Sequence, residues 1–293
     1  MKNRIMSIII LTILTVTLSF TAQASTLYTV GYDVSNNYEF GSVDTVTKQY
    51  QVIKSLGTTM YSNLASQGNG SFYIYENGVG LKTISTNGSI SDGKTITNFT
   101  EKNGPFTPYG MAYRSLDQKI YAYEYTTNSF GSIDSLGAWS ELAGTTGYSA
   151  NYYGNFAGRL AIHNDALYGA IGDLTSADAG FFNTISYAGA TTNSVADIAF
   201  FDMVLASDGT NLYGITGSGP IGFVGTPPPL DPYTNLLYTI SPNGSLSSTA
   251  SPLVNMPYAL TGVAAVGTPE PSTYILLMIA LGAVGFARKK MND

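Results

Sequence analysis

Histidine and cysteine, the residues that most often carry nucleophilic and metal chemistry, are nearly missing from this sequence. The 293 residues include one histidine, His163, and no cysteine. The chain therefore has no thiol nucleophile, iron–sulfur cluster or cysteine-bound zinc, and one histidine cannot form a two-histidine metal site. His163 lies in the stretch LAIHNDALYG, between two strand-like segments. We expect a solvated turn residue there rather than a general base, and we predict no catalytic residue.

Acidic side chains leave calcium as the metal to consider, because calcium accepts oxygen ligands alone. Two stretches are candidates, DLTSADAG at Asp173–Gly180 and SDGTNLYG around Asp208. Neither has the spacing of an EF-hand loop, and aspartate in a turn commonly accepts hydrogen bonds from its own backbone. We therefore predict ordinary turns and no cofactor, with a calcium site as the alternative.

Tyrosine dominates the aromatic residues, with 22 copies against 13 phenylalanines and one tryptophan. A tyrosine within a strand is expected to pack in the core, whereas one in a connection can offer a flat apolar ring and a hydroxyl group to a ligand. Such a surface suits sugar rings or another protein. The candidate ligand-binding residues are Tyr32, Tyr38, Tyr123, Tyr125, Tyr152 and Tyr153.

A repeated strand pattern must position these tyrosines. A unit that begins with an apolar residue followed by tyrosine recurs five times, at successive spacings of 45, 48, 47 and 45 residues. Periods of this size are typical of the four-stranded blades of β-propellers. The units begin at Leu27, Phe72, Ile120, Leu167 and Leu212.

Each unit is followed by a second strand and then by a return strand that leads into the next unit. Two of the second strands end in Asn-Gly, at Asn87–Gly88 and Asn243–Gly244. Asn-Gly between alternating apolar residues predicts a tight hairpin in which both turn residues have positive φ. The apolar-tyrosine strand, the two strands of the hairpin and the return strand make four strand-like steps per repeat, which match one propeller blade.

The two ends of the repeat array complement each other. The last return strand, Pro257–Val266, has no apolar-tyrosine strand after it, and the first apolar-tyrosine strand, at Leu27, has no return strand before it. Pairing these two strands would close a ring and remove an exposed sheet edge. We predict an all-β fold, a five-bladed β-propeller over residues 25–268, with a β-sandwich or an open solenoid as the alternatives.

The net charge of this domain excludes one class of partner. Residues 25–268 hold eight of the 13 basic and 17 of the 19 acidic residues, a formal charge of −9. Such a surface repels phosphates, so we predict no nucleic-acid partner.

The first 24 residues have the three parts of a secretory signal peptide. Lys2 and Arg4 precede the apolar run Met6–Phe20, and small residues stand at Ala22 and Ala24. This arrangement predicts recognition by signal peptidase and cleavage after Ala24. An uncleaved anchor helix is the alternative.

The end of the chain resembles the PEP-CTERM sorting signal of Gram-negative bacteria. Pro269-Glu270-Pro271 is followed by the apolar run Thr273–Ala287 and then by Arg288-Lys289-Lys290. As a helix the run would be ~22 Å long, shorter than a hydrocarbon core of ~30 Å, so it predicts a modest transmembrane anchor with its basic tail in the cytoplasm. The resemblance implies that the motif is recognised by an exosortase, after at least transient insertion in the inner membrane.

These features give an exported protein that is passed to the cell surface or to the extracellular polysaccharide matrix of a biofilm. If it stays unprocessed, it remains anchored in the inner membrane and faces the periplasm. We predict a noncatalytic protein that binds exopolysaccharide or another envelope component through its loops. The alternatives are a propeller-type hydrolase, lyase or lactonase that uses carboxylates, with or without calcium, and a structural spacer in the matrix.

Overall fold

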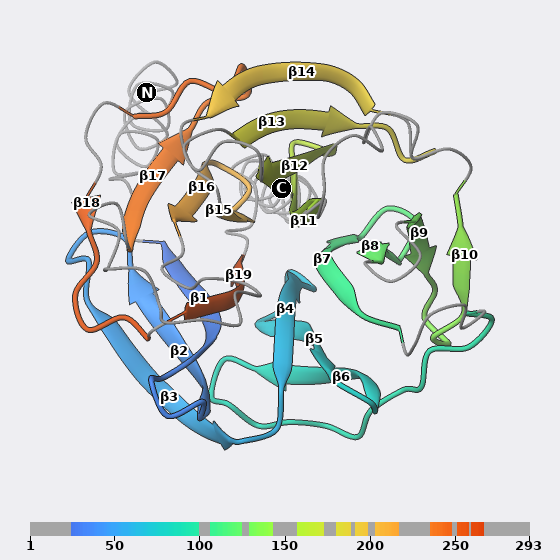
Figure 1. Cartoon of the computed structure of the whole chain (residues 1–293), viewed down its shortest axis with the longest axis horizontal. Coiled ribbons are helices and arrows are strands. Elements are labelled where there is room, and N and C mark those ends of the chain that lie inside the picture. Colours follow the sequence, from blue (N-terminus) through green and yellow to red (C-terminus); the bar gives the residue numbers. More distant parts are fainter. Residues whose placement is uncertain are drawn as a thin grey trace, which may run out of the picture.

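The computed structural model is an all-β ring of five sheets, seen end-on in Figure 1. It describes residues 25–99, 106–124, 129–142, 157–172, 180–188, 191–198, 203–216, 235–247, 251–257 and 259–266. The five sheets are arranged around a common axis, which makes the fold a five-bladed β-propeller and confirms the prediction from the repeat.

Each sheet is one blade, and we number the blades in chain order. Blade 1 is built in the order β19 (Ala259–Ala265), β1 (Thr26–Tyr32), β2 (Tyr38–Asp44) and β3 (Tyr50–Gly57). Blade 2 contains β4 (Tyr61–Ser66), β5 (Ser71–Glu76) and β6 (Gly80–Ser85). Blade 3 contains β7 (Pro108–Arg114), β8 (Lys119–Glu124), β9 (Ser129–Ile133) and β10 (Trp139–Glu141). Blade 4 contains β11 (Ala157–His163), β12 (Ala166–Gly172), β13 (Gly180–Ile185) and β14 (Thr191–Ile198). Blade 5 contains β15 (Met203–Ser207), β16 (Leu212–Thr216), β17 (Leu236–Ile240) and β18 (Ser251–Pro252).

Blade 2 departs from the four strands that the repeat predicts for every blade. Its sheet has three strands, and the chain beyond β6 contacts that strand only through isolated bridges, Ile84 with Ile90 and Leu81 with Lys94. Gly93 and its neighbours thus take the place of an outer strand without forming a continuous ladder.

The ring closes where the sequence predicts. The last strand, β19, pairs antiparallel with β1, from Leu27 opposite Ala265 to Tyr32 opposite Ala259. The first blade is therefore completed by the end of the domain, and closure removes the free edge that β1 would otherwise expose.

The apolar-tyrosine unit recurs because two neighbouring residues of a strand point to opposite faces of a sheet. In every blade the apolar residue packs against the preceding blade, and the tyrosine packs against the following one. In blade 1, for example, Leu27 lies in the cluster shared with blade 5, and Tyr28 packs on the cluster shared with blade 2. The core is thus five apolar wedges between blades rather than one central cluster.

The two predicted Asn-Gly hairpins form, but with a different turn. Gly88 and Gly244 have φ of 81° and 82°, whereas Asn87 and Asn243 do not have positive φ. The Asn87 side-chain oxygen instead accepts a hydrogen bond from the Ser89 amide at 3.0 Å. The loops are therefore three-residue turns in which glycine alone takes the left-handed conformation.

Candidate functional site

The two ends of the ring are different surfaces. The innermost strands β4, β7, β11, β15 and β19 surround the axis (Figure 1). All five occupy the same step of the repeat, so they begin on one face of the ring and end on the other. We call the face where they end the funnel face and the opposite one the tyrosine face. Because Leu27 of β1 pairs with Ala265 of β19, both ends of the described domain, Ser25 and Val266, lie at the funnel face.

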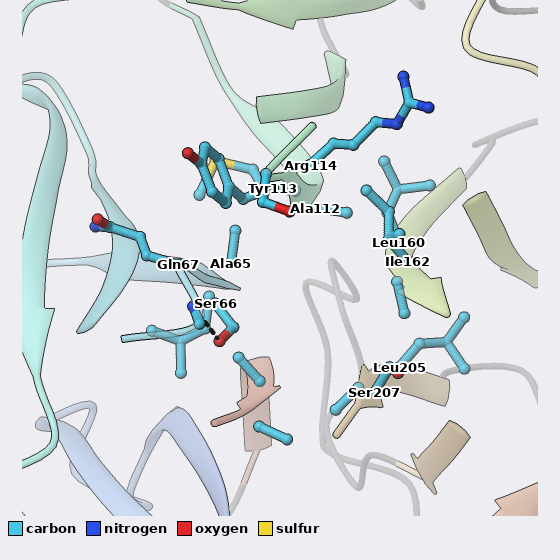
Figure 2. Close-up of a pocket in the computed structure, with 18 of the residues that line it drawn as sticks. Ala65, Ser66, Gln67, Ala112, Tyr113, Arg114, Leu160, Ile162, Leu205 and Ser207 are labelled. Carbon is cyan, nitrogen blue, oxygen red and sulfur yellow. Dashed lines mark hydrogen bonds between the residues drawn. The ribbon is translucent and has the colours of Figure 1, made fainter. Parts of the chain in front are cut away.

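A depression of about 430 Å³ opens on the axis at the funnel face. Small residues make this opening, since each innermost strand contributes one alanine at the same step of the repeat. Figure 2 shows Gln67, Arg114 and Ser207 around the opening, together with Leu160 and Leu205. We call this depression the funnel. The five alanines at this shared step are Ala65, Ala112, Ala161, Ala206 and Ala264.

The charged groups on the rim of the funnel bond to one another. The Arg114 guanidinium donates two hydrogen bonds to Asp165, at 2.7 and 2.8 Å, and a third to Asp117 at 3.3 Å. It also lies 4.0 Å from the centre of the Tyr187 ring. The hydrogen bond from Arg114 holds the pKa of the Asp165 carboxyl below its usual value. This bidentate pair ties blade 3 to blade 4 and gives the rim a structural contact.

His163 is buried, so the expectation of a solvated turn residue is wrong. The hairpin turn consists of Asn164 and Asp165, both with positive φ, and His163 is the last residue of β11. Its side chain is 4 % exposed, and its Nδ1 lies 3.0 Å from the Ser207 hydroxyl of blade 5. Burial lowers the pKa of His163, and the nearby Asp208 offsets part of that effect. Because the turn has only two residues, His163 belongs to the strand and lies in the junction of blades 4 and 5 rather than at the surface.

The structure describes one of the two candidate calcium stretches, the one around Asp208. Asp208 forms the predicted turn, because its Oδ1 accepts hydrogen bonds from the amides of Thr210 and Asn211 at 2.7 and 2.6 Å. Asp173–Gly180 lies outside the described residues apart from Gly180. Across the described ranges, there is no group of three histidine, cysteine, aspartate or glutamate residues that could hold a metal ion.

Between the two mouths the axis narrows to a waist. The free space there is about 10 Å³, no more than one water molecule needs. Strands β19 and β4 approach each other closely there, since a Cβ placed on Gly262 would lie 2.6 Å from the carbonyl carbon of Asn63. The amide of the Asn63 side chain also donates to the Pro108 carbonyl at 2.7 Å. The waist separates the funnel from the opposite mouth.

A second depression, of about 270 Å³, lies at the tyrosine face, and we call it the tyrosine groove. Four of the five innermost strands contain a β-bulge near their start, at this face of the ring, and each bulge leaves one residue unpaired. A bulge redirects the side chain at that position. Three of the unpaired residues, Asn63, Tyr109 and Thr261, line the groove. No sequence signal identified them, because a bulge depends on how two strands pair.

Tyr32 and Tyr38, two of the predicted ligand-binding residues, also line the groove. They are opposite each other in the β1–β2 ladder, with ring centres 5.4 Å apart and planes tilted by 47°. Burial, with a smaller contribution from Tyr32, raises the pKa of Tyr38, so its hydroxyl stays protonated at neutral pH. The connecting loop is held by Asp33, whose Oδ1 accepts hydrogen bonds from the amides of Ser35 and Asn37 at 2.8 and 2.9 Å.

Arg159 is the only charged residue among the described residues that line the tyrosine groove. It lies on β11, and its guanidinium donates to the carbonyl oxygen of Thr261 at 2.8 Å. This bond holds a positive charge between the waist and the groove, in a domain whose overall charge is strongly negative.

The other predicted site residues divide into two groups. Tyr123 is 1 % exposed and packs between blades 3 and 4, so its assignment to a binding surface is wrong. It lies in β8 rather than in the connection after it, so the strand extends further than the pattern suggested. The remaining predicted positions lie outside the described residues: Ala22, Ala24, Tyr125, Tyr152, Tyr153, Pro269, Glu270, Pro271, Arg288, Lys289 and Lys290.

The predicted membrane segment Thr273–Ala287 also lies outside the part of the chain that the structure describes. Within that part, no helix is both long and apolar enough to cross a membrane.

Solved structures with a similar arrangement of strands are distant in sequence. The chain is similar to a chain of the nidogen/laminin complex, with a TM-score of 0.49 and 12 % identity over 84 % of this chain and 100 % of that chain. It is similar to TolB from Acinetobacter baumannii, with a TM-score of 0.44 and 11 % identity over 83 % and 67 % of the two chains. For a streptogramin B lyase the TM-score is 0.39, with 15 % identity over 82 % and 72 %. No functional argument follows from likenesses at this level.

No curated protein matches the chain. One protein family does match, the PEP-CTERM protein-sorting motif, over residues 268–290. This range contains the Pro-Glu-Pro motif, the apolar run and the basic tail. The chain therefore carries a PEP-CTERM sorting motif, which implies an exported protein with a membrane-associated C-terminal signal that an exosortase-type enzyme processes.

Proposed function

We propose that the protein is a noncatalytic component of the cell surface or extracellular matrix and binds polysaccharide through the tyrosine groove. The observation that carries the proposal is the grouping of Tyr32, Tyr38 and Tyr109 in one depression with amide, hydroxyl and guanidinium groups. A sugar ring has apolar C–H faces and a rim of hydroxyl groups. Aromatic rings can cover the faces, and the polar side chains can bond to the rim.

The groove is largely preorganised for such a ligand. The Asp33 turn fixes the loop between Tyr32 and Tyr38, and tyrosine has few rotatable bonds to immobilise when a ligand binds. Its volume of about 270 Å³ is near the lower limit of ligand pockets, roughly 300 Å³. These dimensions suit contact along part of a polymer better than enclosure of a whole ligand.

The positive charge of Arg159 indicates which polysaccharides the groove would prefer. Because Arg159 supplies the charge of the groove, a polymer with carboxylate groups would gain an ion pair there that a neutral polymer lacks. The negative charge of the rest of the domain would repel such a polymer from other surfaces. We therefore propose an acidic polysaccharide as the preferred ligand.

The position of the groove fits an attached sorting signal. Val266 ends the described domain at the funnel face, and six residues separate it from the predicted membrane segment at Thr273. Such a spacer can reach about 25 Å at most. While the chain is tethered, the funnel face would point to the membrane, and the tyrosine groove would point away from it, toward the matrix.

Binding to purified polysaccharides tests this proposal. We expect Tyr32→Ala and Tyr38→Ala each to weaken binding of a uronate-containing polymer about tenfold, or ~1.4 kcal/mol, because each removes one ring from the groove. Arg159→Gln should weaken binding of the acidic polymer but not of a neutral one. The measurement is affinity electrophoresis or calorimetry on the processed protein, with thermal unfolding as a check of folding.

Val34→Ala is the matched control, since Val34 lies in the same loop with 81 % of its surface exposed and does not line the groove. It should bind as the unmodified protein does. If neither tyrosine substitution changes affinity for any polymer that the unmodified protein binds, the groove is not the binding site.

A further inference from the structure

Ser25, the first residue after the predicted signal-peptide cleavage site, is built into the junction of blades 1 and 5. The residue is 8 % exposed. Its backbone amide donates to the Thr45 hydroxyl at 3.1 Å, and its carbonyl accepts from the Thr45 amide at 3.1 Å. Its hydroxyl donates to a carboxylate oxygen of Asp208, which lies 183 positions away in the sequence. The residue expected at the N-terminus of the processed chain is thus fixed by backbone hydrogen bonds to Thr45 and by a side-chain hydrogen bond to Asp208.

Asp208 is a buried carboxylate that accepts four hydrogen bonds from the surrounding protein. It is 1 % exposed, and its Oδ2 accepts hydrogen bonds from the Ser25 hydroxyl and, at 3.0 Å, from the Tyr213 hydroxyl. Its Oδ1 accepts the amides of Thr210 and Asn211. Burial alone would raise the pKa of Asp208, but these hydrogen bonds, that of Ser25 first, lower it below the usual value. The carboxylate is therefore ionised at neutral pH.

We propose that this pocket is a receptor for the α-ammonium group that signal peptidase releases on Ser25. Hydrolysis of the Ala24–Ser25 bond consumes one water, leaves a carboxylate on Ala24, and leaves an amine on Ser25 that takes up a proton at neutral pH. The nitrogen and Oγ of one serine are at most about 4 Å apart by covalent geometry. Because Oγ bonds to Asp208, the new cation lies within roughly 6 Å of the carboxylate, a distance at which opposite charges favour each other's ionised forms.

This contact would couple maturation to closure of the ring. Ser25 directly precedes β1, whose pairing with β19 closes blade 1, and Asp208 belongs to the neighbouring blade 5. Removal of the signal peptide would then add an ion pair across the blade 1–blade 5 boundary. The uncleaved precursor has an uncharged peptide nitrogen at the same position.

The pH range of the contact follows from its two partners. A raised amine pKa gives stability that is present below about pH 8 and is lost as pH rises through the raised value. A lowered Asp208 pKa gives stability that is present above about pH 4 and is lost as pH falls. Among the described residues, the other titratable or charged groups around the pocket are His163, Tyr213, Asp44 and Lys48; Asp44 ends β2 and Lys48 lies in the β2–β3 turn, on either side of Thr45.

A double-mutant cycle on the exported protein tests the proposal. One change inserts Gly-Ser between Ala24 and Ser25, so that the same cleavage places the amine two residues away. The other is Asp208→Asn. We expect the insertion to raise the unfolding equilibrium constant about tenfold in the Asp208 protein and to have little effect in the Asp208→Asn background, because the interaction requires both charges.

A second measurement does not depend on an Asp208 variant that folds. The rate at which an amine-selective reagent labels the N-terminus, followed against pH, reports the pKa of the α-amino group. We expect a value above about 8 in the unmodified protein and an ordinary value in the Gly-Ser insertion variant. Equal values in the two proteins, zero coupling in the cycle, or a mature N-terminus other than Ser25 by sequencing would each overturn the proposal.

Discussion

The two mouths of the ring differ in how they are made. The funnel is larger in volume, about 430 Å³ against about 270 Å³, because small alanines recur at one step of all five innermost strands. Its charged rim residues, Arg114 and Asp165, bond to each other. The tyrosine groove is smaller in volume, but bulges bring Asn63, Tyr109 and Thr261 into it. Regular repetition thus gives an opening, whereas irregular pairing gives a varied set of chemical groups.

The same contrast separates two populations of tyrosine. Tyrosines at the start of each repeat pack between blades, where their rings fill the wedge toward the next blade. Tyr32 ends β1 and Tyr38 begins β2 at the tyrosine face, where both line the groove, although Tyr38 also packs against the wedge between blades 1 and 2. The position along the strand, rather than the residue type, decides which role a tyrosine takes.

Tyr123→Ala should have the largest effect, and it separates the two populations. Tyr123 is 1 % exposed between blades 3 and 4, so its truncation leaves a cavity that the neighbouring blades cannot fill. We expect a loss of about 3–5 kcal/mol in the free energy of unfolding, measured by chemical denaturation. Tyr32→Ala serves as the comparison and should cost much less stability. Equal losses in the two variants would mean that the tyrosines do not differ in role.

Gly262→Val tests the waist that keeps the two mouths apart. A side chain at this position would meet the Asn63 backbone at 2.6 Å, and a backbone cannot move aside as a flexible side chain can. We expect a loss of about 1–3 kcal/mol or more in the free energy of unfolding. Ser66→Ala, on the rim of the funnel, is the control and should change stability little. A Gly262→Val protein of unchanged stability would show that the waist is not closely packed.

His163→Gln should have the smallest effect on stability. The residue lies at the funnel face, so the change leaves the tyrosine groove intact. Burial lowers its folded-state pKa, so the unfolded chain binds the proton more readily. Stability should therefore fall as pH drops below about 6.5, the value of an unperturbed histidine. His163→Gln removes this titration, so we expect a flatter dependence of the unfolding midpoint on pH between about 7 and 5. Identical pH profiles for the two proteins would argue that the histidine titrates as it does in the unfolded chain.

Much of the fold could be predicted from the sequence because the repeat reflects packing directly. Leu27 and Tyr28 must enter two different wedges, and the same requirement recurs in every blade, so the pattern is visible at regular spacing. The missing ladder strand of blade 2 could not be predicted, because isolated bridges and a continuous ladder do not differ in residue pattern. The same holds for the turn at Gly88, where Asn-Gly is compatible with more than one hairpin.

The candidate site was less predictable. Tyr32 and Tyr38 were identified because they flank a short polar connection, and the structure brings them to one groove. Tyr123 was assigned wrongly, since the end of a strand cannot be located to within a residue or two from its pattern. Asn63, Tyr109, Thr261 and Arg159 were not identified, because their place in the groove depends on strand register and on contacts between blades.

The sequence by itself determined the number of blades, the strand that closes the ring, and the sorting motif at residues 268–290. These are local or periodic properties, written in residues that are close together or equally spaced. Only the tertiary structure decided that His163 is buried, that bulged residues reach the groove, and that Ser25 meets Asp208. Ring closure brings the first and last blades together, and contacts between residues far apart in the chain leave no regular pattern along it.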